Sequence, residues 1–213
     1  MTLDRPVRRL VVVSAGLSQP SSTRLLADRL AAATDTGLRE AGLEPWVRVV
    51  SVRDHAQDLV NNVLTGFPGD TLREAIDAVQ GADGLIAATP IFTGSYSGLF
   101  KLFFDVLDRG ALAGLPVLVA ATGGTARHSL ALDHALRPLF AYLGALVIPT
   151  GVYAASEDWG REATAAEPAL AHRIRRAARE LAAEVAARPA RVAVDPFDHP
   201  VPLDGLLGDL PDR

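Results

Sequence analysis

The chain of 213 residues contains no cysteine. This absence excludes disulfide bonds, thiol nucleophiles and cysteine-based metal sites together. Lysine is almost missing as well, because Lys101 is the only one among 21 basic residues. The formal net charge of −4 leaves no excess of positive charge, so nucleic acid is not expected as a partner.

Long hydrophobic runs are also lacking. The apolar run Leu10–Val13 has the length of a buried strand, and none approaches the length of a membrane span. Arginines precede this run, but neither an h-region nor a cleavage site accompanies them, so we expect no signal peptide and a cytoplasmic protein. The five histidines show no H-E-x-x-H or other paired ligand spacing, and no metal site is expected.

What the chain does contain is a high proportion of apolar residues, 49%, which is typical of a well-buried α/β protein. Its length suits one domain of ordinary size. We expect this domain to span residues 1–188. Residues 189–213 contain five prolines, and we expect them to form an extended tail whose apolar side chains pack on a surface, such as that of a neighbouring subunit.

Apolar segments alternate with helical patterns along the chain, which predicts a parallel sheet with right-handed crossovers. The predicted buried strands are Arg9–Ser14, Gly84–Thr89, Val117–Thr122 and Ala145–Pro149, with a more amphipathic strand, Trp46–Val52, nearer an edge. The predicted helices are Thr23–Ala41, Asp70–Val79, Gly98–Leu107, Leu130–Leu143 and Glu167–Ala187. The pattern predicts a three-layer α/β/α sandwich around five strands in the flavodoxin-like order 2-1-3-4-5.

One segment, Asp54–Gly69, does not fit this alternation. It contains Asn61-Asn62 and Phe67-Pro68-Gly69, and we interpret it as a long connection with one helical turn. Long ordered connections in compact domains are often functional or lie at an interface.

The loop between the first strand and the first helix is rich in hydroxyl groups, with four in the six positions from Ser18 to Thr23. The unpaired amides of a helix N-terminus favour an anion, and hydroxyls can add donors around it. A single serine would suffice as a helix cap. We therefore predict a phosphate site, made by Ser18, Ser21, Ser22 and Thr23.

Two further loops should share the ligand edge of the sheet. Pro90 to Gly98 combines turn-forming residues with Phe92 and Tyr96, so its backbone could bind the edge of a flat heteroaromatic ring while the aromatic side chains give apolar contact. Ala121 to His128 contains Gly123-Gly124, which lets the backbone approach a ligand closely. Arg127 and His128 could contact a phosphate or a ring oxygen. Either loop alone is weak evidence, but three loops at one edge indicate a binding site.

Several nucleotide and hydrolase motifs are absent. The first loop lacks G-x-G-x-x-G, and no acidic residue ends the second strand, which disfavours a Rossmann dinucleotide site. A G-x-x-x-x-G-K-[ST] sequence is missing too. The segment Gly94–Gly98 places Tyr96 where a nucleophile elbow needs serine.

The three loops resemble those of the NAD(P)H-dependent FMN reductases of the flavodoxin-like superfamily, in particular the branch that partners luciferase-like monooxygenases and is similar to the alkanesulfonate-monooxygenase flavin reductases. The resemblance covers roughly residues 8–160, including Ala135–Phe140, and is vaguer beyond. In that family the first loop holds the FMN phosphate. The second loop contacts the isoalloxazine ring, which implies Pro90, Ile91, Phe92, Thr93, Gly94 and Ser95. The third lies at the ring's other edge, which implies Thr122, Gly123, Gly124 and Thr125.

The resemblance implies hydride transfer from NADPH or NADH to FMN, and release of reduced FMN to a separate monooxygenase. Because the flavin itself supplies this chemistry, no catalytic side chain is expected. The resemblance also implies a homodimer or homotetramer. Two alternatives remain open at this point: a quinone or azo reductase that retains its FMN, and a non-enzymatic electron carrier.

Overall fold

The computed structural model describes residues 5–160 and 169–191. Within these ranges the strands are β1 (Val7–Ser14), β2 (Glu44–Ser51), β3 (Gly84–Pro90), β4 (Pro116–Gly123), β5 (Leu146–Val147) and β6 (Val152–Ala155). The α-helices are α1 (Ser22–Glu40), α2 (Ala56–Thr65), α3 (Asp70–Gln80), α4 (Gly98–Asp105), α5 (Arg137–Tyr142), α6 (Ser156–Gly160) and α7 (Ala169–Ala186). Three shorter helical segments are η1 (Val52–His55), η2 (Ala126–His128) and a π-helical turn, η3 (Leu132–Leu136).

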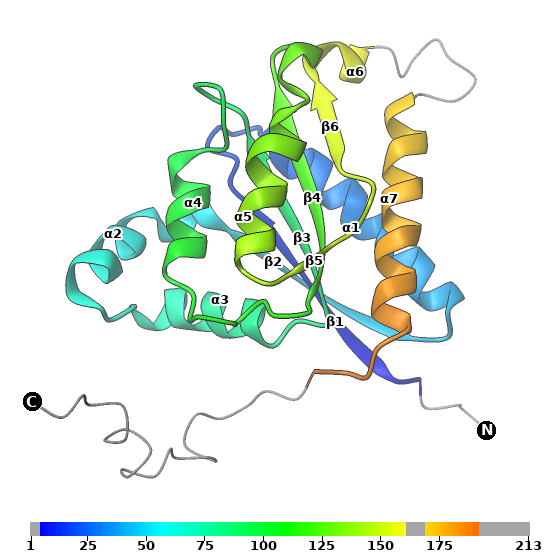
Figure 1. Cartoon of the computed structure of the whole chain (residues 1–213), viewed down its shortest axis with the longest axis horizontal. Coiled ribbons are helices and arrows are strands. Elements are labelled where there is room, and N and C mark those ends of the chain that lie inside the picture. Colours follow the sequence, from blue (N-terminus) through cyan, green and yellow to red (C-terminus); the bar gives the residue numbers. More distant parts are fainter. Residues whose placement is uncertain (1–4, 161–168, 192–213) are drawn as a thin grey trace, which may run out of the picture.

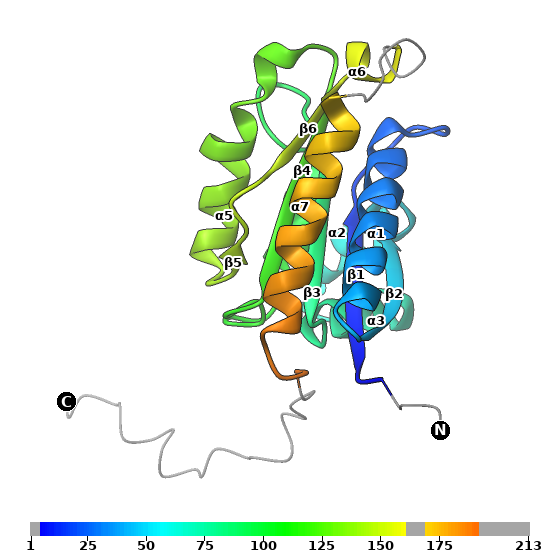
Figure 2. The ribbon, with the colours of Figure 1, turned by 90° about the vertical axis from the view of Figure 1, so that its right-hand side faces the viewer.

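The strands form one parallel sheet in the order β2-β1-β3-β4-β5, which confirms the predicted topology, with β2 at an edge. Helices α1 and α7 cover one face, and α2 to α5 cover the other (Figures 1 and 2). Along β1, Leu10 and Val12 face α1 and α7, whereas Val11 and Val13 face the opposite layer. Both faces of the strand are therefore buried, which explains its continuous apolar sequence.

The layer opposite α1 and α7 contains a cluster of fully buried phenylalanines. The Phe104 ring lies edge-on to Phe100 and to Phe140, with ring centroids 4.8 and 4.9 Å apart. Two of these rings come from α4 and one from α5. The cluster therefore fixes both helices that follow the second and third loops, and with them the distance between those loops.

The predicted strand Ala145–Pro149 is wrong in its extent. Only Leu146–Val147 pairs with the start of β4, and the chain then leaves the sheet and returns as β6 beside Ala120–Gly123. Pro149 has no N–H to give to a ladder, so pairing stops before it. The carboxylate of Glu180 on α7 accepts the Thr150 N–H at 2.8 Å and the Thr150 hydroxyl at 2.7 Å, which holds the interruption in place.

The interpretation of Asp54–Gly69 as a connection with one helical turn is also wrong. It contains the end of η1 and the ten residues of α2, and the helix ends at Gly66 in the left-handed region, at φ +80°. Leu59 and Asn62, three residues apart, are both buried, so the segment does have a helical inner face. The asparagine pair that suggested a turn lies inside the helix.

The helix predicted over Leu130–Leu143 is present, but it is not regular. Its first part is the π-helical turn η3, and the Arg137 N–H bonds to the Leu132 carbonyl five residues earlier. Pro138 cannot donate a hydrogen bond to the preceding turn, which interrupts the regular pattern at this point.

At the amino edge of the sheet, the last described residue is anchored to the fold. The buried carboxylate of Asp83 accepts the backbone N–H of Arg9 at 2.7 Å and that of Arg191 at 2.6 Å. The Arg191 guanidinium also donates to the carbonyls of Gln80, Ala111 and Ala113. The predicted tail beyond Arg191, and Glu167 and Pro168 of the last predicted helix, lie outside the described residues.

Candidate functional site

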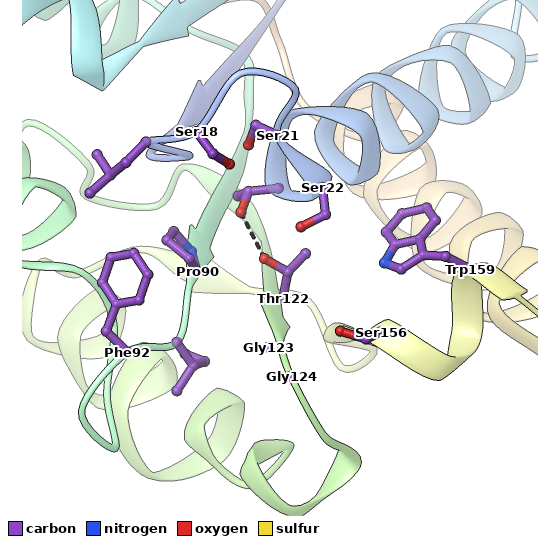
Figure 3. Close-up of a pocket in the computed structure, with 13 residues that line it drawn as sticks. Ser18, Ser21, Ser22, Pro90, Phe92, Thr122, Gly123, Gly124, Ser156 and Trp159 are labelled. Carbon is purple, nitrogen blue, oxygen red and sulfur yellow. Dashed lines mark hydrogen bonds between the residues drawn. The ribbon is translucent and has the colours of Figure 1, made fainter.

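A cleft of about 490 Å³ lies at the carboxyl ends of β1, β3 and β4, where the sequence places the three loops (Figure 3). Its lining includes ten of the fourteen predicted site residues: Ser18, Ser21, Ser22, Thr23, Pro90, Ile91, Phe92, Thr122, Gly123 and Gly124. Thr93, Gly94, Ser95 and Thr125 do not line it, and Leu17, Ser156 and Trp159 line it without having been predicted. The volume is in the usual range for a small-molecule site.

The four hydroxyls of the first loop have different roles. Ser21 is the N-cap of α1, and its hydroxyl accepts the Arg24 N–H at 3.2 Å. The buried Thr23 hydroxyl lies 2.7 Å from that of Thr122 and joins the first loop to β4. Ser18 and Ser22 are exposed, and neither side chain has a hydrogen-bond partner among the described residues. These two hydroxyls are therefore available to a ligand.

The first loop packs tightly behind its hydroxyls. A Cβ added to Gly16 would lie 2.0 Å from Ser21 Oγ, so a larger residue at this position would displace the helix cap. The first turn of α1 contains no acidic residue. Among residues 5–160 and 169–191 no lysine or arginine lines the cleft either, so the positive potential that these residues give it comes from the helix N-terminus and its amides.

The second loop brings only its first half to the cleft. Pro90, Ile91 and the half-exposed Phe92 line it, whereas residues 93–95 form the tip of a tight turn. The Phe92 N–H donates to the Ser95 carbonyl at 3.0 Å, and Gly94 has φ +76°. The turn therefore directs Thr93 to Ser95 away from the cleft. Tyr96, predicted to contact the ligand, instead packs on Phe100 in the core layer.

The third loop is supported from behind by Tyr153 of β6. The Tyr153 hydroxyl donates to the Thr125 carbonyl at 2.9 Å, and a Cβ on Gly123 would lie 2.1 Å from that hydroxyl oxygen. Burial, together with the nearby charge of Asp158, raises the pKa of Tyr153, which keeps the hydroxyl protonated as a donor. Thr125 caps η2, and the exposed Arg127 and His128 do not line the cleft.

The remaining wall comes from α6, which the sequence analysis missed together with β6. Trp159 and Ser156 lie across the cleft from Phe92 (Figure 3). The Arg29 guanidinium of α1 lies 5.1 Å from the centre of the Trp159 ring, and Asp158 binds both the Ala155 N–H and Arg173 of α7. These contacts hold α6 against the two helices of one face. The acidic pair Glu157-Asp158 after Ser156 was the available signal for a helix start.

The arrangement suits a flat, phosphate-bearing ligand such as a flavin mononucleotide. One end offers helix amides and two free hydroxyls for a phosphate, and the other offers an aromatic side chain and glycine backbone for a planar ring. Among residues 5–160 and 169–191 no cluster of side chains is suited to a metal ion, and no helix could cross a bilayer. The fold and cleft together define the class of flavodoxin-like flavin-binding proteins.

The particular family follows from comparison with known proteins. The family model of the NADPH-dependent FMN reductases matches residues 8–160, so the chain belongs to that family. It is 40% identical to an FMN reductase (NADPH) of Pseudomonas aeruginosa over 174 residues, which cover 82% of this chain and 90% of the relative. It is 37% identical to the NADH-dependent FMN reductase SfnF of Pseudomonas putida, over 82% of this chain and 91% of that protein.

A solved structure agrees with this assignment. An oxidoreductase from Corynebacterium diphtheriae is 46% identical and superposes with a TM-score of 0.82, covering 86% of this chain and 99% of that one. The chain is therefore an NAD(P)H:FMN oxidoreductase, which uses FMN together with a reduced nicotinamide dinucleotide. The alternative of a non-enzymatic electron carrier does not agree with these relatives.

Proposed function

We propose that FMN binds in the cleft with its phosphate at the first loop and its ring between the second and third loops, and that the reduced flavin is released to a separate monooxygenase. The observation that carries this proposal is the difference in chemistry between the two ends of the cleft. Ser18, Ser22 and the amides of α1 lie at one end, whereas Phe92 and Gly123-Gly124 lie at the other. This order matches the phosphate and ring of one FMN molecule.

When bound, FMN supplies the ring that accepts a hydride from the nicotinamide. The chain's own contribution is binding and orientation. The first turn of α1 binds the phosphate through N–H groups and hydroxyls, and the Thr23–Thr122 bond keeps that turn at a fixed distance from β4. Phe92 and the Pro90-Ile91 backbone limit where the ring can lie. Hydride transfer requires no proton from a side chain, so we assign no catalytic acid or base.

Release of the flavin is favoured by the composition of the cleft. An arginine or lysine would add a strong charge-assisted bond to the phosphate, and no such residue in the part of the chain that the structure describes lines the cleft. Two of the four hydroxyls of the first loop are already bonded within the protein. This donor set supports exchange of FMN rather than its permanent retention.

The test is steady-state oxidation of NADPH and NADH at varied FMN concentration, together with the absorbance spectrum of the purified protein. We expect activity that requires added FMN and a protein that loses its yellow colour on gel filtration. In a two-chamber assay, a flavin-dependent monooxygenase behind a dialysis membrane should still turn over. Retained yellow colour with ping-pong kinetics toward a quinone would support the quinone or azo reductase alternative instead.

We also propose that the chain forms a homodimer or homotetramer through the outer face of α2. Val60, Val63 and Leu64 lie at helical spacing on α2, and Phe67 follows the helix just after its cap, Gly66; each of the four is between 44% and 79% exposed. We call these four residues the α2 stripe. Burying exposed apolar surface is favourable by about 25 cal/mol per Å², and groups of exposed apolar side chains often mark interfaces.

A further inference from the structure

A second groove lies directly beside the proposed flavin cleft. It has a volume of about 420 Å³ and extends from the first loop to the end of β2. Ser18 and Ser21 line both cavities, so the first loop is the wall between them. A ligand that enters the flavin cleft from this flank would cross the first loop and continue into the groove.

The groove is lined by charged side chains from two elements. Arg24 and Asp28 come from α1, and Arg53 and Asp54 come from η1. Arg24 is already paired, because its Nε lies 2.7 Å from Asp28 Oδ1. Arg53 is exposed, and its guanidinium has no hydrogen-bond or ion-pair partner among the described residues. Of the two arginines that line the groove, Arg53 is therefore the one available to bind an anion.

We propose that this groove binds the adenosine end of the reduced nicotinamide dinucleotide, and that Arg53 binds its 2′-phosphate and makes the chain prefer NADPH. The proposal rests on the proposed position of FMN, since the nicotinamide has to reach the flavin ring while the adenosine half lies outside the cleft. The planar guanidinium can give two parallel hydrogen bonds to a phosphate. Asp54, the exposed neighbour of Arg53, would repel a 2′-phosphate but accept a bond from a ribose hydroxyl.

The test compares wild type with Arg53→Ala by two readouts. The first is kcat/KM for NADPH and for NADH at saturating FMN. We expect the NADPH value to fall about tenfold or more, as for loss of a charge-assisted bond, and the NADH value to change less than twofold. The second is calorimetric binding of adenosine 2′,5′-bisphosphate, compared with adenosine 5′-monophosphate, to protein without FMN. Arg53→Ala should weaken binding of the bisphosphate but leave binding of the monophosphate unchanged. An unchanged KM for FMN would show that the variant is folded.

Arg109→Ala is the matched control. Arg109 is also exposed and without a side-chain partner among the described residues. It lies before β4, at the amino ends of the strands, and the groove lies at their carboxyl ends. Arg109→Ala should leave kcat/KM for NADPH and for NADH unchanged. The proposal is overturned if the wild type shows no preference for NADPH, or if Arg53→Ala lowers kcat/KM equally for NADPH and NADH. It is also overturned if Arg127→Ala, on the other flank of the cleft, removes the preference instead. In all three cases the enzyme still reduces FMN, whereas a wild type inactive with both nucleotides would refute the proposed function itself.

Discussion

The hydroxyls of Thr23 and Thr122 lie 2.7 Å apart, although 99 residues separate them in sequence. Both side chains are buried, one in the first turn of α1 and the other near the end of β4. Figure 3 shows this bond between the first loop, where we propose the phosphate lies, and the strand that leads into the third loop. The bond therefore couples the two loops that have to hold one ligand.

Removing one of these hydroxyls should lower the free energy of unfolding by more than half as much as removing both does. Thr23→Val leaves the Thr122 hydroxyl buried without this partner, a loss of about 1–3 kcal/mol, and Thr122→Val does the same to Thr23. The double variant leaves neither hydroxyl orphaned, so its loss should be smaller than the sum of the single losses. Urea unfolding of all four proteins measures this coupling. Strictly additive losses would contradict it.

The free hydroxyls of the first loop should discriminate between flavins. Ser18→Ala with Ser22→Ala should weaken FMN binding roughly tenfold or more but leave riboflavin nearly unchanged, because riboflavin has no phosphate for these donors. Fluorescence titration with both flavins measures the effect. Ser95→Ala is the control, since Ser95 lies in the turn of the second loop and does not line the cleft. Equal weakening of both flavins by the double variant would assign the first loop another role.

Gly123 and Tyr153 should show strong non-additivity. Gly123→Ala alone places a methyl group 2.1 Å from the Tyr153 hydroxyl oxygen, so the third loop or the ring has to move. Tyr153→Phe removes that oxygen, together with its bond to the Thr125 carbonyl. We expect each single variant to raise the KM for FMN several-fold. Adding Tyr153→Phe to Gly123→Ala should improve the enzyme rather than harm it further, as steady-state kinetics can show.

Glu180 should make stability depend on pH in the acid range. Burial acts to raise its pKa, but hydrogen bonds from Thr150 and the ion pair with Arg176 outweigh burial, and the pKa is lowered. A lowered pKa in the folded state gives stability that is present above the unfolded pKa and is lost as pH falls through the folded value. Glu180→Gln should therefore be less stable than wild type near pH 7, by about 1 kcal/mol or less because solvent screens this partly exposed carboxylate, and the difference should shrink toward pH 3. A difference that is constant over this range would contradict the assignment.

The α2 stripe should control oligomeric state. Leu64→Glu with Phe67→Glu places two charges in the most exposed part of the stripe, and we expect the assembly to dissociate, as measured by light scattering after gel filtration. Asn61→Glu is the control, because Asn61 is exposed on the same helix but is not part of the stripe. A wild-type protein that is monomeric at micromolar concentration would exclude this interface.

The sequence analysis predicted the parts of the fold that depend on burial on both faces. The continuous apolar runs of β1, β3 and β4 could be recognised because a parallel strand between two helical layers has no polar face. The strand β6 could not, because its four residues Val152–Ala155 follow Pro149 and Gly151 and have no clear boundary of their own. Its pairing depends on the free edge of β4, a tertiary contact that local sequence does not encode.

The same reason accounts for the site residues that were missed. Ser156 and Trp159 reach the cleft only because β6 carries the chain back to the carboxyl edge of the sheet. The glycines and hydroxyls of the loops were visible as residue types, but which of them face the cleft depends on turn geometry. Gly94 at φ +76° reverses the second loop, and this excludes Thr93 and Ser95 from the lining.

The bonds of Asp83 and Arg191 have a practical consequence for anyone who handles the enzyme. Arg191 is held at the end of the molecule where β1 begins, which is the lower end in Figure 2. The cleft lies at the opposite ends of the strands, the carboxyl ends of β1, β3 and β4. An affinity tag, a surface linker or a second enzyme attached at Arg191 would therefore start from the end of the molecule that is remote from the site where FMN is bound and released. Immobilisation through this point should leave turnover intact.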